Sequence, residues 1–160
     1  MTNLEQIQDF LAQKRLAIVG VSHNPKSFSR SLYNEFKSRG YDTVAVNPAA
    51  DEIAGERCYA RLQDIRPPVD AVLLMTSPQV TDTVVRDCVE AGIKQVWMYR
   101  AAGQGAVSEA AVQFCRDHGI QVVAGECPYM FFPGAGWLHR FHGLVKKISG
   151  AYPRPAAVTR

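Results

Sequence analysis

The chain has 160 residues, of which 47% are hydrophobic and 21% charged, and its formal net charge is +3. This length fits one domain, and the composition provides for a buried core and excludes an intrinsically disordered chain. The small positive charge suits a protein that binds an anionic small molecule. Proteins that bind nucleic acid usually concentrate more basic charge on one face, so we expect no nucleic-acid partner.

The start of the chain and its cysteines bear on the compartment. Residues 1–10 lack the basic and apolar stretches of a signal peptide. The longest clean apolar run, 71–75, is far shorter than the roughly 20 residues that cross a membrane. The four cysteines form no C-x-x-C pair, so no zinc or redox motif is expected. We therefore expect a soluble, cytoplasmic protein with reduced thiols and no membrane partner.

Strand and helix patterns alternate along the chain. A capping box from Thr2 to Glu5 predicts a short opening helix. Helices are then predicted from Ser29 to Gly40, from Ser77 to Gly92, and before Gly119, because a capping residue precedes and a glycine follows an amphipathic stretch. Apolar runs between the helices predict five buried strands: 16–20, 43–46, 69–75, 96–98 and 120–124.

Strands separated by helices in this way indicate βαβ units with right-handed crossovers. We therefore predict an α/β fold, a Rossmann-like three-layer sandwich with a five-stranded parallel sheet in the order 3-2-1-4-5. One domain is expected over 1–150, and the proline-containing residues 151–160 are expected to form a flexible tail.

The polar segment between the first strand and the next helix is the strongest candidate site. Ligands of an open parallel sheet bind beyond the carboxyl ends of its strands, and a helix N-terminus there favours phosphate. Hydroxyl groups and two cations strengthen this preference. The candidate residues are Gly20, Val21, Ser22, Pro25, Lys26, Ser27, Ser29 and Arg30. The alternative is that the serines only cap the helix and shape a turn.

This segment is not the glycine-rich dinucleotide fingerprint. Gly20 is its one glycine, so G-x-G-x-x-G is absent. The second strand ends at Asn47 and Pro48, where an NAD site has a carboxylate for the ribose. An NAD(P)-dependent oxidoreductase is therefore the less favoured reading.

A set of short motifs runs in fixed order from about residue 15 to 125. They are Ala17-Ile-Val-Gly-Val-Ser22 with Pro25, Gly40-Tyr, Val46-Asn-Pro48, Glu52-Ile-x-Gly55, Tyr59 and Val69-Asp-Ala-Val72. Together they resemble the small CoA-binding proteins, which are similar in turn to the CoA-binding N-terminal domain of succinyl-CoA synthetase α and other acyl-CoA ligases.

The resemblance implies coenzyme A bound across the strand ends. Its pyrophosphate would lie at residues 21–29 and its 3′-phosphate near Lys26 or Arg30. Its adenine would lie near two pairs of residues: Asn47 with Pro48, and Ser77 with Pro78.

Two segments depart from the family's pattern. Tyr99-Arg-Ala101 stands where the family tends to have glutamine and glycine, which leaves the place of the pantetheine arm open. The segment from Cys127 onward, Cys-Pro-Tyr-Met-Phe-Phe-Pro-Gly, is also unusually rich in aromatic residues.

Other groups are weaker candidates. His139 and His142 with Cys127 could supply three metal ligands, but capping or solvated histidines are commoner, so no metal is expected. Cys127 could form a mixed disulfide with a CoA thiol, or be a structural thiol. Three aromatic side chains could stack on adenine, although a strand tryptophan is more simply a core residue: Tyr59, Trp97 and Tyr99.

Catalytic motifs are missing, since the sequence has no G-x-S-x-G, H-E-x-x-H or P-loop. His23 is the one histidine near the crevice, and no carboxylate follows it closely enough in sequence to orient it as a base. We expect a non-catalytic protein that binds CoA or acyl-CoA as a carrier, sensor or partner subunit. The alternative is a detached CoA-binding subunit that works with a ligase-type protein partner.

Overall fold

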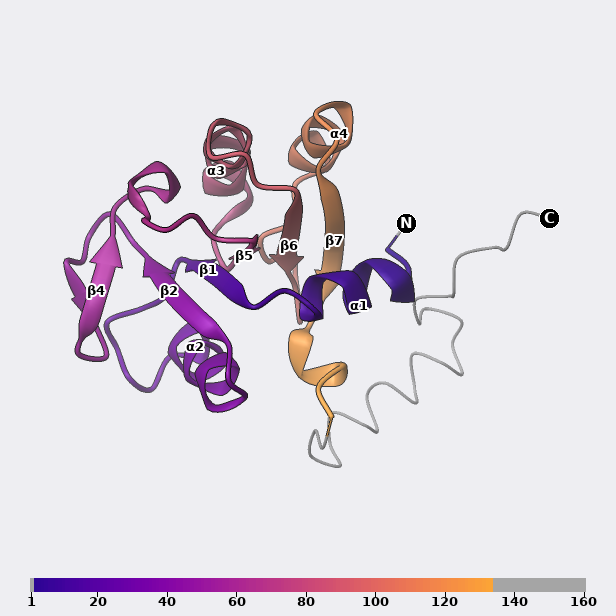
Figure 1. Ribbon diagram of the computed structural model, residues 1–160. Coiled ribbons are helices and arrows are strands. Elements are labelled where there is room, and N and C mark those ends of the chain that lie inside the picture. The colour runs from indigo at the N-terminus through magenta and orange to yellow at the C-terminus, as the bar shows by residue number, and fades with distance from the viewer. Residues whose placement is uncertain (1, 134–160) are drawn as a thin grey trace.

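A computed structural model describes residues 2–133 as a central sheet with helices on both faces (Figure 1). The helices are α1 (Leu4–Leu11), α2 (Phe28–Ser38), α3 (Pro78–Glu90) and α4 (Glu109–Asp117), with short 3₁₀ helices η1 (Leu62–Asp64) and η2 (Pro128–Met130). The strands are β1 (Arg15–Val19), β2 (Asp42–Val46), β3 (Glu52–Ile53), β4 (Glu56–Tyr59), β5 (Ala71–Leu74), β6 (Gln95–Tyr99) and β7 (Gln121–Glu126). The tail expected over 151–160 and the pair His139 and His142 lie outside the described residues.

The sheet has seven strands in the order β3-β4-β2-β1-β5-β6-β7. All neighbouring strands are parallel except β3, which is antiparallel to β4. The parallel strands, numbered in chain order, follow the Rossmann order 3-2-1-4-5-6. The α/β Rossmann-like class is therefore confirmed, but the prediction of five strands is wrong.

The predicted strand order is also wrong in one placement. It put the strand after β2, here β5, beside β2. In the structure β4 pairs with β2, and β5 pairs with the opposite side of β1. The missed β4 is the third parallel strand in chain order, so every later parallel strand takes a number one higher than predicted.

Sequence analysis did not predict the β3–β4 hairpin, because its turn residues and its short strands lack the usual sequence signals. Its two turn residues, Ala54 (φ 57°) and Gly55 (φ 77°), both have positive φ, as a type I′ turn requires. Asn-Gly or Asp-Gly is the usual signal for this turn, and alanine in the left-handed region is uncommon. The strands are also short and carry charged residues, as edge strands often do.

Alternate residues of the strands form two hydrophobic layers. Val19, Val46, Leu74 and Met98 belong to the layer under α3 and α4. Their neighbours on the opposite face of the sheet pack under α1 and α2, where Trp97 is fully buried. Figure 1 shows α3 and α4 together on one face and α2 on the other, so the predicted three-layer arrangement is confirmed.

The helix starts differ in detail from the sequence prediction. Ser27, not Ser29, is the N-cap of α2, and its side chain accepts from the Arg30 N–H. The capping box of α1 joins Asn3 and Gln6, while the Thr2 hydroxyl exchanges hydrogen bonds with Ala124. Ser77 does precede α3, with Pro78 in its first turn.

The four cysteines are buried and form no disulfide. Within residues 2–133, no helix is long and apolar enough to cross a membrane.

Candidate functional site

The order of the sheet reverses between β1 and β5, and Gly20 lies at this point. Its N–H donates to the Val46 carbonyl at 2.9 Å, and its φ is +91°. A Cβ on this residue would lie 2.7 Å from the carbonyl oxygen of Met75. The chain can therefore turn from β1 into the following loop only because residue 20 has no side chain.

The loop from Gly20 to Ser27 is held by its own side chains. The Ser22 N–H donates to the Ser29 hydroxyl at 3.0 Å, and the Asn24 N–H donates to the Ser22 hydroxyl at 3.1 Å. The Ser27 hydroxyl accepts from the Arg30 N–H at 3.2 Å. The oxygens of the three serines thus shape the turn and cap the helix, which was the alternative to direct phosphate binding.

The start of α2 nevertheless offers donors to an anion. Among the described residues, the backbone N–H groups of Phe28 and Ser29 have no acceptor, as is usual in a first turn. The guanidinium of Arg30 is half-buried, with Nη1 3.5 Å from the Ser22 carbonyl and a buried Nε that has no partner within residues 2–133. Lys26 is exposed beside them. The Phe28 and Ser29 N–H groups, the Arg30 Nε and the Lys26 ammonium are therefore groups that could donate to a phosphate.

An apolar cavity of about 570 Å³ lies on the α3 side of this loop. Three predicted site residues line it: Gly20, Asn47 and Pro48. Its other walls are mostly aliphatic side chains that sequence analysis did not assign to a site: Val19, Val46, Leu62, Val80 and Val84. The Val80 side chain is 47% exposed. A flat apolar group such as a base can fill such a space.

The rim of the cavity carries a charge network. Arg61 Nη2 lies 2.8 Å from Asp87 and 3.7 Å from Glu90. The side chain of Gln63 also donates to Asp87, at 2.9 Å. Two carboxylates therefore lie beside the Arg61 guanidinium, which lines the cavity.

Several residues that were predicted for the site lie outside the lining of the apolar cavity or have a structural role. Ser77 and Pro78 do not line the cavity, although the adjacent Thr76 does. Val21 is fully buried. Asn47 lines the cavity and also ties the two loops together, because its Nδ2 donates to the Val21 carbonyl at 2.9 Å. Lys26, Ser27, Ser29, Ser22, Pro25 and Arg30 lie beside the cavity's end at Gly20 rather than within its lining.

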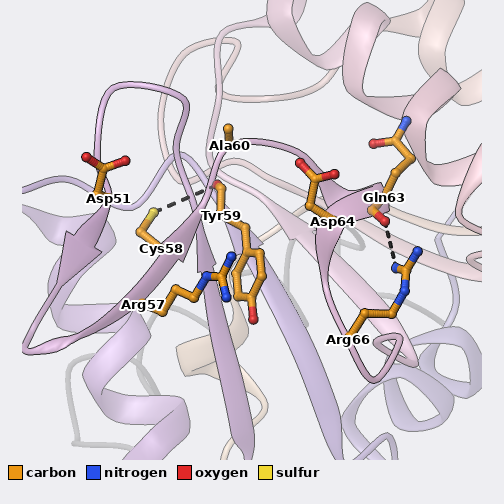
Figure 2. A pocket seen from close by; sticks show the side chains of 8 residues that line it. All are labelled: Asp51, Arg57, Cys58, Tyr59, Ala60, Gln63, Asp64 and Arg66. Atoms are coloured by element: carbon orange, nitrogen blue, oxygen red, sulfur yellow. Dashed lines mark hydrogen bonds between the residues drawn. The ribbon is translucent and has the colours of Figure 1, made fainter.

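A second cavity, of about 600 Å³, is polar and lies along β4 and η1 (Figure 2). Two carboxylates and two guanidinium groups line it, from Asp51, Asp64, Arg57 and Arg66. The Arg57 guanidinium carbon lies 4.7 Å from the centre of the Tyr59 ring. Tyr59 therefore belongs to this second cavity and does not line the apolar one, where it was predicted to stack on adenine.

The structure also shows where the remaining aromatic and cysteine candidates lie. Trp97 is a core residue with no exposed surface, so it cannot stack on a ligand. Cys127 is 8% exposed. Tyr99 lies beside it, and burial, with a smaller effect of the Cys127 thiol, raises the pKa of Tyr99 to about 12. Within residues 2–133, no cluster of three or more His, Cys, Asp or Glu side chains could hold a metal ion.

Comparison with known proteins fits this geometry. Residues 14–133 match the model of the CoA binding domain family, so the chain belongs to that family. It is 29% identical over 123 residues to the uncharacterized protein YneT of Bacillus subtilis, covering 76% of this chain and 88% of YneT. A hypothetical protein of Pyrococcus horikoshii has a similar structure, with a TM-score of 0.71, 27% identity, and coverage of 78% of this chain and 85% of that one.

A longer protein matches as well. Over 127 residues the chain is 24% identical to the ADP-forming acetate–CoA ligase II of Archaeoglobus fulgidus. The match covers 74% of this chain but only 19% of the ligase.

Proposed function

We propose that this chain binds coenzyme A or an acyl-CoA across the carboxyl ends of β1 and β5, and that it catalyses no reaction on its own. The observation that carries the proposal is an apolar cavity of about 570 Å³ that ends at Gly20, where the loop to the N-terminus of α2 begins. The cavity suits the adenine, and the donors of Phe28, Ser29 and Arg30 suit the pyrophosphate. Membership of the CoA binding domain family supports the same ligand.

The chemistry at the two ends of the nucleotide favours CoA over NAD. An NAD site places a carboxylate at the end of the second strand to accept from the ribose. Here that position is Asn47, whose amide already donates to Val21. CoA adds a 3′-phosphate that needs a cation, and Lys26 and Arg30 are within one turn of the helix start.

A thermal-shift comparison of CoA, dephospho-CoA, NAD and NADP at equal concentration tests the proposal. A ligand at 100 times its dissociation constant stabilises the fold by about 2.7 kcal/mol, which should raise the melting temperature by several degrees. We expect the largest shift with CoA and a smaller one with dephospho-CoA. A larger shift with NAD or NADP would overturn the proposal in favour of an oxidoreductase.

The non-catalytic part rests on the isolation of His23. This histidine is exposed, and no side chain within residues 2–133 forms an ion pair or hydrogen bond with it. We expect no thioester formation when the purified chain is incubated with acetate, ATP and CoA. ATP-dependent acetyl-CoA formation that is lost in His23→Ala would show that the chain is an enzyme.

A ligase subunit is the second candidate function. The match covers 19% of the acetate–CoA ligase, as it would if this chain corresponded to one module of a larger enzyme. Affinity purification of the tagged full chain in the presence of CoA distinguishes the two roles. A stoichiometric large partner that carries ligase activity would support the subunit, and a chain that purifies alone would support a free-standing binder.

A further inference from the structure

The second cavity, along β4 and η1, is lined by charged side chains that the proposed function does not use. They are the carboxylates of Asp51 and Asp64 and the guanidinium groups of Arg57 and Arg66, around a space of about 600 Å³. Small-molecule sites in proteins have volumes of roughly 300–1,000 Å³, so this space is large enough for a ligand. We call it the polar cavity.

Both guanidinium groups of the polar cavity are held by groups other than carboxylates. Arg57 and Tyr59 are two residues apart on β4, so their side chains lie on the same face of the strand. The Arg57 guanidinium carbon lies 4.7 Å from the centre of the Tyr59 ring. Arg66 Nη1 donates to the carbonyl oxygens of Gln63 at 2.7 Å and of Ile65 at 2.8 Å. These contacts fix the two side chains and leave most of their N–H donors available to a ligand.

The opposite charges of the polar cavity do not pair with one another. Within residues 2–133, none of the four charged side chains that line it belongs to an ion pair. Glu52 lies opposite Arg57 in the β3–β4 pairing, but it neither forms an ion pair with Arg57 nor lines the cavity. The four lining groups are exposed, so a ligand can reach them.

The carboxylates and the guanidinium groups occupy different parts of the polar cavity. Figure 2 shows Asp51 and Asp64 in the upper part of the view and the two arginine side chains below them. The backbone of Asp51 is tied to β4, because its carbonyl accepts from the Cys58 N–H at 2.8 Å, and Asp64 ends η1. The cavity therefore has a negative part and a positive part, each attached to regular backbone.

We propose that the polar cavity is a second ligand site, which binds a small zwitterion with an ammonium group at one end and a carboxylate at the other. The planar guanidinium groups of Arg57 and Arg66 suit the carboxylate. The ammonium donates to Asp51 and Asp64. A ligand of one sign only would meet two groups of its own charge, so the same four residues select against it.

This site goes beyond the proposed CoA function and does not depend on it. The polar cavity and the apolar cavity have one lining residue in common, Ala60. The two ligands would therefore occupy neighbouring but different spaces.

Amide NMR titrations of the full chain with three probes of one carbon skeleton test the inference. The probe γ-aminobutyrate carries both charges, butyrate carries only the carboxylate, and butylamine carries only the ammonium. We expect γ-aminobutyrate to shift the amide signals of residues 57–66 and to bind at least about fivefold more tightly than either other probe, because it makes a charge-assisted contact that each of them lacks. Butyrate or butylamine binding within twofold of γ-aminobutyrate, or no shift with any probe, would overturn the inference.

Two charge variants locate the effect. Asp64→Asn should weaken γ-aminobutyrate about threefold or more without weakening butyrate, whereas Arg57→Gln should weaken both. Glu52→Gln is the matched control, because Glu52 is a neighbouring exposed carboxylate that does not line the cavity. It should bind γ-aminobutyrate within twofold of the wild-type chain. Wild-type affinity in both Asp64→Asn and Arg57→Gln would overturn the site.

Competition with CoA separates this site from the proposed nucleotide crevice. Saturating CoA should leave γ-aminobutyrate bound. Displacement of the probe by CoA would overturn the inference, because it would assign the two arginines to the nucleotide. A chain that binds γ-aminobutyrate but shows no thermal shift with CoA would contradict the proposed CoA function and leave the zwitterion site standing.

Discussion

The two ends of the candidate crevice are built in different ways. On the α3 side, aliphatic residues of two strands, η1 and one helix line a cavity, and a network of Arg61, Asp87 and Gln63 lies at its rim. On the α2 side, three aromatic rings form an open surface around Phe28. The enclosed end suits a group of fixed shape such as a base. The loop 20–27 separates them, so changes at each place should affect different parts of a ligand.

The largest effect is expected at Gly20, because both ends depend on the turn there. Gly20→Ala adds a Cβ 2.7 Å from the Met75 oxygen at a φ of +91°. We expect a loss of about 3 kcal/mol or more in the free energy of unfolding, measured by urea denaturation, and weakened binding of all CoA ligands.

Gly40→Ala is the matched control for that prediction. Gly40 has nearly the same φ, +89°, but an added Cβ meets nothing within 4 Å. It should cost only about 1–2 kcal/mol, the price of the left-handed conformation. Equal losses at the two positions would show that the close approach to Met75 does not matter.

The next effect concerns the centre of the crevice. The double change Lys26→Ala and Arg30→Ala should weaken CoA at least tenfold, because charge-assisted phosphate contacts contribute about 1.5–3 kcal/mol each. The loss should be the same for CoA and for acetyl-CoA, since it concerns the part that both share. Affinities within twofold of wild type in calorimetry would remove these cations from the site.

Filling the cavity should affect only the enclosed end. Thr83 lines the cavity on α3, and Thr83→Trp would occupy the space assigned to adenine. We expect a loss of about tenfold in CoA affinity, close to 1.4 kcal/mol, with little change in the free energy of unfolding because residue 83 is exposed. Val89→Trp, farther along the same helix, should bind CoA normally. An unaffected Thr83→Trp variant would move the adenine elsewhere.

The smallest effect is a pH dependence where β4 meets α2. Glu56 of β4 forms an ion pair with Lys37 and accepts from the Tyr33 hydroxyl at 3.0 Å, both on α2. The hydrogen bond from Lys37, with a smaller one from Tyr33, holds the pKa of Glu56 below its usual value of 4.5. A carboxyl whose pKa is lowered by folding stabilises the fold above its unfolded pKa and loses that contribution as pH falls through the folded pKa.

Glu56→Gln should therefore lower the free energy of unfolding by less than about 1 kcal/mol at neutral pH, since the pair is partly exposed, and by almost nothing well below the folded pKa. Denaturant titrations at the two pH values measure this difference. Glu52→Gln on the adjoining β3 is the control, because Glu52 forms no ion pair within residues 2–133. A loss that is equal at both pH values would contradict the role of the Glu56 charge.

The sequence by itself determined the class of the fold, and it predicted a ligand crevice at Gly20. Continuous apolar runs ending at residues such as Gly20 mark strands buried on both faces, and the regular helices between them require a parallel sheet. The capped start of α2 beside Lys26 and Arg30 could be recognised because capping and phosphate binding depend on neighbouring residues.

Only the tertiary structure decided how the site is divided. Leu62, Val80 and Thr83 come from η1 and α3, and nothing in their local sequence predicts a cavity. Tyr59 lines a second cavity because the β3–β4 hairpin forms the edge of the sheet. The Ala54–Gly55 turn of that hairpin lacks the usual sequence signal for a turn. Phe28, Tyr99 and Tyr129 lie together because the start of α2, the end of β6 and η2 meet at the same edge of the sheet. Such contacts depend on strand order, which pairs residues that are distant in the chain and which no local pattern encodes.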